Sequence, residues 1–157
     1  MSLRKIVKTA QPWNLGITTS DLRSAGTDAN VSMVVYGWSR DNDDESGEKV
    51  MIRSEDIPLR NKSDNFERGK TDKFKIELPG EIQEIYKVRI GHDGAGRFSG
   101  WHLNQLSLAP VAAQGNLQYD FMCDRWLASG EDDGELQAGI DNKKVDIVEK
   151  VDKVIKV

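Results

Sequence analysis

Two short loops in this sequence carry the residues best suited to bind a ligand. Residues 25–30 read Ala-Gly-Thr-Asp-Ala-Asn, and residues 63–69 read Ser-Asp-Asn-Phe-Glu-Arg-Gly. Both loops are small or polar, both contain carboxylates, and both lead into alternating apolar patterns that are typical of strands. Hard cations prefer oxygen ligands from carboxylates and carbonyl groups. If the two loops lie at the same end of a β-sandwich, they could hold such a cation.

Short strand-like segments surround both loops and predict an all-β fold. The segments that alternate with period two, or that are rich in β-branched and aromatic residues, are 13–19, 31–38, 49–53, 73–78, 85–91, 101–108 and 117–123. Turn formers such as Pro79 and Gly80 separate them, and no long helical pattern precedes the tail. This arrangement predicts an antiparallel β-sandwich of seven or eight strands.

The chain has the length of one domain, 157 residues. We expect an N-terminal extension over 1–11, a single sandwich over 12–140 and a tail or linker over 141–157. Apolar residues of the tail recur at helical spacing: Ile147, Val148, Val151, Val154 and Ile155. Strand alternation fits nearly as well over 145–151, and valine lowers helix propensity. The tail is therefore predicted to form a short amphipathic element.

Composition and charge disfavour several classes of partner and chemistry. Charged residues make up 31% of the chain, but the net charge is only -4 and both signs are spread along it, so nothing favours nucleic acid. The one cysteine, Cys123, is predicted to be a small buried hydrophobe, which favours a reducing compartment. The N-terminus lacks the apolar core of a signal peptide, and no apolar run is long enough to span a bilayer. We therefore expect an intracellular protein.

The acidic run 41–47 alternates carboxylates in a way that suggests an EF-hand loop. The geometry fails, because Ser46 stands where the sharp turn needs glycine and Ile52 stands where a bidentate glutamate should close the site. A solvated turn is the preferred interpretation.

Several further motifs occur together with the two loops. The set is Ala-Gly-Thr-Asp at 25–28, Asn-Phe-Glu-Arg-Gly at 65–69 followed by Asp72 and Phe74, Val-Arg-Ile-Gly-His-Asp at 88–93, Gly-Trp-His-Leu at 100–103 and Arg-Trp-Leu at 125–127. Each is weak alone, but their order makes residues 12 to 140 resemble the PLAT domain, also called the lipoxygenase homology or LH2 domain. The first loop and the Gly-His-Asp motif are most similar to the tandem PLAT repeats of lipoxygenase-homology-domain proteins of hair cells.

The resemblance implies an eight-stranded sandwich that acts as a targeting or adaptor module, often with calcium. Its expected partners are a membrane lipid surface or membrane and cytoskeletal proteins, without nucleic acid, and the default oligomeric state is a monomer. It would be one repeat of a larger scaffold at the cytoplasmic face of the plasma membrane or in a cell projection such as a stereocilium.

The resemblance also nominates calcium ligands, residue by residue. The positions are Gly26, Thr27, Asp28 and Asn30 in the first loop and Asp64, Asn65 and Glu67 in the second, with Asp93 replacing an acidic residue that some members carry where this chain has Gly100. Without a cation these carboxylates would repel one another if the loops meet, so an ion would stabilise the closed arrangement. The alternative is that Asp28 caps a turn and Glu67 pairs with a nearby arginine.

Members of the family often contact membranes through exposed loop tryptophans, which settle at the headgroup level. Here the loop before residue 25 offers Leu22 and Arg23 instead. The best candidates for membrane or partner contact are Leu22, Trp38, Arg97 and Phe98, whereas Trp101 and Trp126 are expected in the core. A protein-binding role is therefore favoured over bilayer insertion.

Catalysis is not expected. The two histidines, His92 and His102, cannot supply the iron ligands of a lipoxygenase, and the Gly-x-Ser-x-Gly elbow of lipases does not occur. His92 beside Asp93 fits an acid–base pair, although a structural hydrogen bond is the commoner reason for such neighbours. Two alternatives stay open: a calcium-independent protein-interaction domain that uses a sheet face or residues 53–70, and a regulatory domain cut from a lipase- or lipoxygenase-type enzyme.

Overall fold

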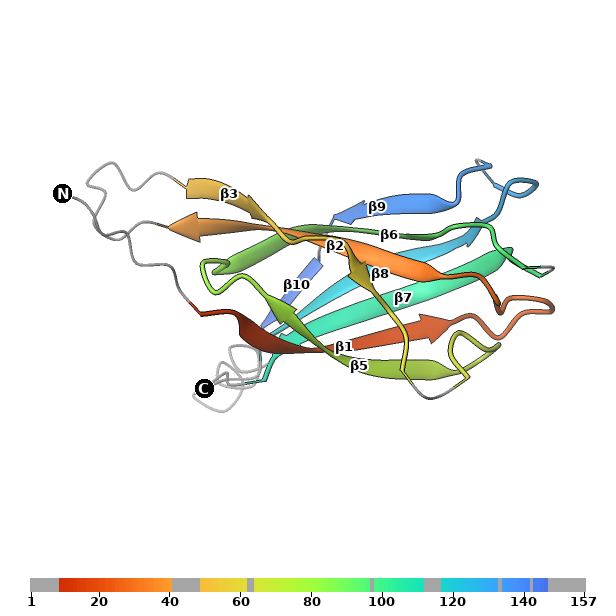
Figure 1. The fold of residues 1–157 in the computed structure, drawn as a ribbon, viewed down its shortest axis with the longest axis horizontal. Coiled ribbons are helices and arrows are strands. Elements are labelled where there is room, and N and C mark those ends of the chain that lie inside the picture. Colours follow the sequence, from red (N-terminus) through yellow and green to blue (C-terminus); the bar gives the residue numbers. More distant parts are fainter. Residues whose placement is uncertain are drawn as a thin grey trace, which may run out of the picture.

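The computed structural model describes residues 9–40, 49–61, 64–96, 98–111, 117–132, 134–141 and 143–146, and these residues form two facing antiparallel sheets without a helix (Figure 1). The first sheet has the order β10 (Lys143–Asp146), β8 (Leu117–Leu127), β7 (Trp101–Pro110), β1 (Gln11–Thr19) and β5 (Thr71–Leu78). The second has the order β3 (Lys49–Arg53), β2 (Val31–Arg40), β6 (Glu84–His92) and β9 (Gln137–Asp141), and the short β4 (Ile57–Pro58) also pairs with β2.

The core lies between the two sheets because each strand alternates inward apolar and outward polar side chains. In β1, for example, Trp13, Leu15 and Ile17 are buried and the intervening residues are more exposed. Trp101 on β7 and Phe121 on β8 are fully buried in the same cluster. Each such side chain contributes roughly 1.5–3 kcal/mol on burial, so the alternation itself determines which face of each strand points inward.

The predicted all-β sandwich is confirmed, and seven of its strands match β1, β2, β3, β5, β6, β7 and β8. The structure has three strands more than these seven, namely β4, β9 and β10. They are short, and Gln-Ala-Gly-Ile-Asp in β9 lacks the β-branched run that marks a strand. Residues 143–146, at the start of the predicted tail, form β10 beside β8. The acidic run 41–47 and the apolar residues from Ile147 onward lie outside the described residues.

Four loops that cross from one sheet to the other meet at one end of the sandwich, on the right in Figure 1. They connect β1 to β2, β4 to β5, β6 to β7 and β8 to β9. The two loops singled out in the sequence, 25–30 and 63–69, belong to the first two of these connections. Within the described part of the chain, no helix is long and apolar enough to cross a membrane.

Candidate functional site

The loop at residues 25–30 lies between two other loops and is hydrogen-bonded to both. The backbone N–H of Thr27 donates to the carbonyl of Phe66 at 3.0 Å, and the N–H of Asp28 donates to the carbonyl of Phe98 at 3.1 Å. The two acidic loops therefore meet at one end of the sandwich, which is the condition that the cation hypothesis requires, and the β6–β7 loop joins them.

The approach of the second loop depends on the absence of a side chain at Gly26. A Cβ atom at this position would lie 2.8 Å from the carbonyl oxygen of Phe66 and 3.3 Å from the backbone nitrogen of Arg68. Both neighbours are backbone atoms, which cannot move without displacing the loop. Glycine is therefore required here for close packing of the two loops.

Thr27 is a buried connector of these loops. Its hydroxyl donates to the carbonyl of Ser99 at 2.6 Å and accepts from the N–H of Ala29 at 3.1 Å. Only 3% of the residue is exposed. Because the hydroxyl already has a donor and an acceptor partner, its evident role is to order the loop, and the sequence alone did not predict that role.

Phe66 anchors the second loop to the core. Its ring is buried, with its centroid 5.1 Å from that of Trp101 and 5.9 Å from that of Phe74. The backbone of Phe66 has φ 63°, a left-handed conformation that costs roughly 1–3 kcal/mol for a non-glycine residue. Burial of the ring and a 2.8 Å hydrogen bond from its N–H to the carboxylate of Asp72 offset this strain.

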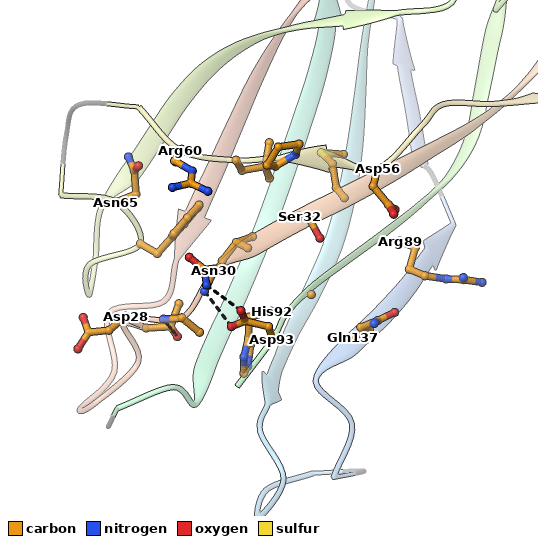
Figure 2. Close-up of a pocket in the computed structure, with 18 of the residues that line it drawn as sticks. Asp28, Asn30, Ser32, Asp56, Arg60, Asn65, Arg89, His92, Asp93 and Gln137 are labelled. Atoms are coloured by element: carbon orange, nitrogen blue, oxygen red, sulfur yellow. Dashed lines mark hydrogen bonds between the residues drawn. The ribbon is translucent and has the colours of Figure 1, made fainter. Parts of the chain in front are cut away.

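The side chain of Asn65 faces its own loop rather than residues 25–30. Its amide nitrogen donates to Asp72 at 3.1 Å and to the side-chain oxygen of Asn61 at 3.0 Å. Figure 2 shows the Asn65 amide and the Asp28 carboxylate pointing in different directions. Asp72 thus positions both Asn65 and Phe66. Asp72 was recognised in a motif, but no local pattern revealed this role, because its partners are set by the fold of the loop.

Glu67 experiences the field of the neighbouring carboxylates. Partial burial raises its pKa, and repulsion from Asp64 and then Asp28 raises it further; Asp72 acts in the same direction and Lys70 opposes it. Within the described ranges, no three acidic, histidine or cysteine side chains are close enough together to hold a metal ion. The carboxylates therefore share one electrostatic neighbourhood but are not gathered around a single point in this conformation.

The nearest arginine in the chain, Arg68, pairs with Asp21 rather than with Glu67. The two side chains form an exposed ion pair at 2.8 Å. As far as the described residues extend, neither Asp28 nor Glu67 has a side-chain hydrogen bond or ion pair of its own. The two carboxylates are therefore available to a ligand.

Asn30 and Asp93 form a separate connection between the first loop and the β6–β7 loop. The Asn30 amide and backbone N–H donate to the two Asp93 carboxylate oxygens at 2.7 and 3.1 Å (Figure 2). The backbone N–H of Ala95 also donates to Asp93, at 2.9 Å. These hydrogen bonds, above all the one from the Asn30 side chain, lower the pKa of Asp93 to about 2. Both Asp93 oxygens are thus already used in holding the loops.

His92 makes a structural contact rather than an acid–base pair with Asp93. The N–H of Gly94 donates to Nδ1 at 3.0 Å, which leaves the proton on Nε2, and Nε2 donates to the carbonyl of Leu127 at 2.6 Å. The ring is buried. It connects the last residue of β6 to the last residue of β8. The backbone N–H of His92 also donates to the carbonyl of Leu136 in the β8–β9 loop at 3.1 Å.

The candidate contact residues divide between two surfaces. Leu22 and Phe98 are large apolar residues at the loop end, 45% and 70% exposed. Trp38 lies on β2 and stacks on Tyr86, with centroids 4.7 Å apart, so it belongs to the outer face of the second sheet. Arg97 lies outside the described residues.

The other residues singled out in the sequence differ in burial. Trp101 is fully buried in the core, as predicted. The prediction for Trp126 was wrong, because it is half-buried outside the core cluster, with its ring nearly perpendicular to that of His102 at 5.1 Å. Cys123 is partly buried against the core, and burial raises the pKa of its thiol to about 11. A thiol that holds its proton so firmly is a poor nucleophile.

A hollow of about 520 Å³ opens beside the loops, over β2, β6 and the segment after β4. Asn30 and Asp93 lie on its floor, with Arg60 and Asn65 on one side and Arg89 on the other (Figure 2). Acidic, basic and amide groups all line it, so the hollow favours no ligand of a single charge sign.

Comparison with known proteins identifies the family. Residues 13–138 match the family model of the PLAT/LH2 domain, and the chain belongs to this family. It is 35% identical over 136 residues to human lipoxygenase homology domain-containing protein 1, covering 87% of this chain but only 6% of that protein. It is 30% identical over 143 residues to PLAT domain-containing protein 1 of Arabidopsis thaliana, covering 88% of this chain and 75% of that protein.

A similar fold also occurs in solved lipoxygenase structures. The crystal structure of coral 8R-lipoxygenase, described as activated by calcium through a C2-like domain, matches with a TM-score of 0.62 and 20% sequence identity, over 83% of this chain and 17% of the lipoxygenase. The likeness at this level of identity concerns the fold.

Proposed function

We propose that this chain is a non-catalytic PLAT module that binds calcium at the loop end and thereby associates with a membrane surface or with membrane or cytoskeletal proteins. The observation that carries the proposal is the position of Glu67. Its carboxylate lies in the field of Asp64 and Asp28 from two loops joined by a backbone hydrogen bond, and no arginine within the described ranges neutralises it.

The donor set suits a hard cation. Calcium takes six to eight oxygen ligands and tolerates irregular geometry. The carboxylates of Asp28, Asp64 and Glu67 would supply charge, and the backbone carbonyls of Gly26 and Thr27 would supply neutral oxygens. Bound calcium would neutralise the mutual repulsion and stabilise the loop end by mass action.

The remaining proposed ligands have other bonds in this conformation. Asn65 would have to leave Asp72, and Asn30 and Asp93 would have to leave each other. Asn30 and Asp93 therefore contribute best as a support that holds the first loop against the β6–β7 loop. The core of the proposed site is the carboxylate set Asp28, Asp64 and Glu67.

The relatives support both the calcium proposal and the proposal of a larger scaffold. The coral lipoxygenase of the same fold is described as calcium-activated through its C2-like domain, and the human relative is many times longer than this chain. We therefore place this chain as one repeat of a larger scaffold. A position at the cytoplasmic face of the plasma membrane or in a cell projection would suit Leu22 and Phe98 as the residues that contact a bilayer.

Calcium titration by calorimetry and thermal melting tests whether the chain binds calcium at the proposed site. Wild type should release or absorb heat at up to millimolar calcium and melt at a higher temperature. The double variant Asp28→Asn with Glu67→Gln should lose both effects. Glu77→Gln, an exposed carboxylate on β5, is the matched control and should keep them. An unchanged melting temperature and no heat in the wild type would end the calcium proposal.

Flotation with phosphatidylcholine–phosphatidylserine vesicles tests whether the module binds a membrane or a protein partner. Vesicle binding that requires calcium and is lost in chelator would support a membrane role. Calcium binding without flotation would instead favour a protein partner.

A calcium-independent protein-interaction domain is the second candidate, and the absence of a preassembled three-residue metal group in the described ranges favours it. It would bind its partner equally well in chelator. A regulatory domain cut from a lipase- or lipoxygenase-type enzyme is the third candidate, because the matched region is only 17% of the coral lipoxygenase. The full-length gene product distinguishes this case.

A further inference from the structure

The outer face of the second sheet carries a group of aromatic and cationic side chains, one of which, Arg89, also lines the hollow beside the crossing loops. In the strand register, Tyr36 on β2 stands opposite Arg53 on β3 and Lys87 on β6. Cross-strand partners point to the same side of a sheet. We call the following set the Tyr36 face: Tyr36, Trp38, Arg53, Tyr86, Lys87 and Arg89.

Three cations surround a single ring. The distances to the Tyr36 ring centroid are 5.9 Å for the Arg53 guanidinium carbon, 5.6 Å for Lys87 Nζ and 5.7 Å for the Arg89 guanidinium carbon. A cation held over an aromatic ring at this distance is attracted by the negative face of the ring. These contacts hold the side chains in place, while the three like charges repel one another.

The cations lack acidic partners in the part of the chain that the structure describes. None of the three forms an ion pair there, and Arg53 makes one hydrogen bond, from Nε to the carbonyl of Ser54. Asp141 stands opposite Lys87 in the register of β9 and β6, but no ion pair forms between them. The three cations outnumber the two carboxylates that the register puts on the same side, Glu84 opposite Trp38 and Asp141 opposite Lys87.

The face is a platform rather than a protrusion. Trp38 and Tyr86 are stacked, with 23° between their planes, and both are half-buried. Met51, which stands opposite Trp38 on β3, is 50% exposed and extends the apolar surface. Figure 2 shows Arg89 extending along the sheet, away from Asn30 and Asp93.

We propose that the Tyr36 face binds an acidic segment of a protein partner in an extended conformation. Carboxylates on alternate residues of such a segment are about 6.6–6.8 Å apart, and β3 and β6 are separated by two strand spacings of about 4.8 Å. Successive carboxylates can therefore reach cations on both strands and form charge-assisted hydrogen bonds. The methylene groups of these acidic side chains pack on the rings and on Met51, because the intervening residues of an extended segment point away from the face.

The geometry favours a peptide over a bilayer. The rings lie against one another beneath the cations, whereas residues that enter a membrane interface project beyond their surroundings. Leu22 and Phe98, the apolar residues proposed for membrane contact, lie at the crossing loops. Tyr36 is five residues along β2 from Val31, where that strand leaves the loop end, which is roughly 16 Å. The binding proposed here thus requires no calcium.

An amide-resonance titration of the isotope-labelled chain in chelator tests the proposal. The probe is a ten-residue peptide of alternating glutamate and valine, and a lysine–valine peptide is the control. Resonances of Tyr36, Trp38, Arg53, Lys87 and Arg89 should shift with the acidic peptide only, and added salt should weaken the binding.

Matched variants test whether the Tyr36 face is the surface that binds the peptide. The triple variant Arg53→Gln, Lys87→Gln and Arg89→Gln should weaken binding by about tenfold or more. Lys73→Gln with Lys75→Gln, which removes exposed lysines from β5 of the other sheet, should bind normally. Thermal melting of each variant verifies that it is folded, and a triple variant that fails to fold is replaced by Arg89→Gln alone, expected to weaken binding about threefold.

Three results would overturn the proposal. The first is no shift with the acidic peptide, and the second is equal weakening by the triple and the control variants. The third is binding of phosphatidylserine vesicles that the triple variant abolishes while the peptide leaves the spectrum unchanged, which would make the face a membrane contact. Because chelator is present throughout, failure here is separate from failure of the calcium proposal.

Discussion

The backbone N–H of Thr27 donates a 3.0 Å hydrogen bond to the carbonyl oxygen of Phe66, and this contact joins the two acidic loops. Phe66 is itself fixed by its ring in the core, so the bond transmits the rigidity of the sandwich to residues 25–30. The same contact keeps Asp28 in the field of Glu67. The scaffold thus holds like charges near one another at the loop end.

Replacing Gly26 by alanine should destabilise the fold and loosen the loop end. The new Cβ would lie 2.8 Å from the Phe66 carbonyl oxygen, and such overpacking typically costs about 1–3 kcal/mol. Urea unfolding measures the loss. Gly130→Ala is the control, because nothing lies within 4 Å of a Cβ there. Equal stabilities for the two variants would show that the loops do not need this close approach.

Thr27→Val should cost about 1–3 kcal/mol although the side chain keeps its shape. The substitution leaves the Ser99 carbonyl and the Ala29 N–H without their buried partner. Thr18→Val removes a hydroxyl that bonds Thr71 at an exposed site and should change the free energy of unfolding much less. Chemical denaturation of both variants checks the contrast, and similar losses would argue against a special role for Thr27.

Glu67→Gln should have opposite effects without and with calcium. Partial burial and the neighbouring Asp64 and Asp28 raise the pKa of Glu67, so its charged form is disfavoured and removal of the charge should raise the melting temperature in chelator. The rise in melting temperature that calcium produces should be smaller in this variant than in the wild type. Melting curves in both buffers test this. A variant that melts lower in chelator and responds normally to calcium would contradict it.

Asp93 should make stability depend on acid pH. Its folded pKa of about 2 lies below the value of about 3.9 for an unfolded aspartate. The contribution of Asp93 to the free energy of unfolding is therefore present above about pH 4 and is lost as the pH falls through about 2. The difference in melting temperature between wild type and Asp93→Asn should narrow over that range.

NMR can identify the group that lowers the pKa of Asp93. Carboxyl-carbon NMR titration should give Asp93 a pKa near 2 in the wild type, and Asn30→Ala should raise it, because the Asn30 side chain is the largest cause of the shift. A titration that Asn30→Ala leaves unchanged would show that another group holds the carboxylate.

Phe98→Ser should reduce vesicle flotation without changing stability. Phe98 is 70% exposed, and substitutions at such sites usually alter the free energy of unfolding by less than about 0.5 kcal/mol. Met122→Ser is the control, because Met122 is 48% exposed on β8, away from the crossing loops. If both variants float equally well, Phe98 does not contact the bilayer.

The sequence by itself determined the fold class and most strands, because period-two alternation records which side of each strand is buried. It also identified both acidic loops, whereas the structure placed them together at one end of the sandwich. It missed β9, whose Gly139 and short length weaken the alternation, and β10, where valine spacing suited a helix and a strand alike. Residues 143–146 form a strand because they pair with β8. This pairing joins segments that are distant in the sequence, so the local pattern does not predict it.

Only the tertiary structure decided how the nominated ligands are used. Thr27, Asn65 and Asp93 have the right chemistry for a cation, but their bonds to Ser99, Asp72 and Asn30 are made between residues up to 72 positions apart. The same is true of the Tyr36 face, whose cations come from β3 and β6. A sequence specifies which groups can donate and accept, whereas the packing of loops and strands selects which partner each group meets.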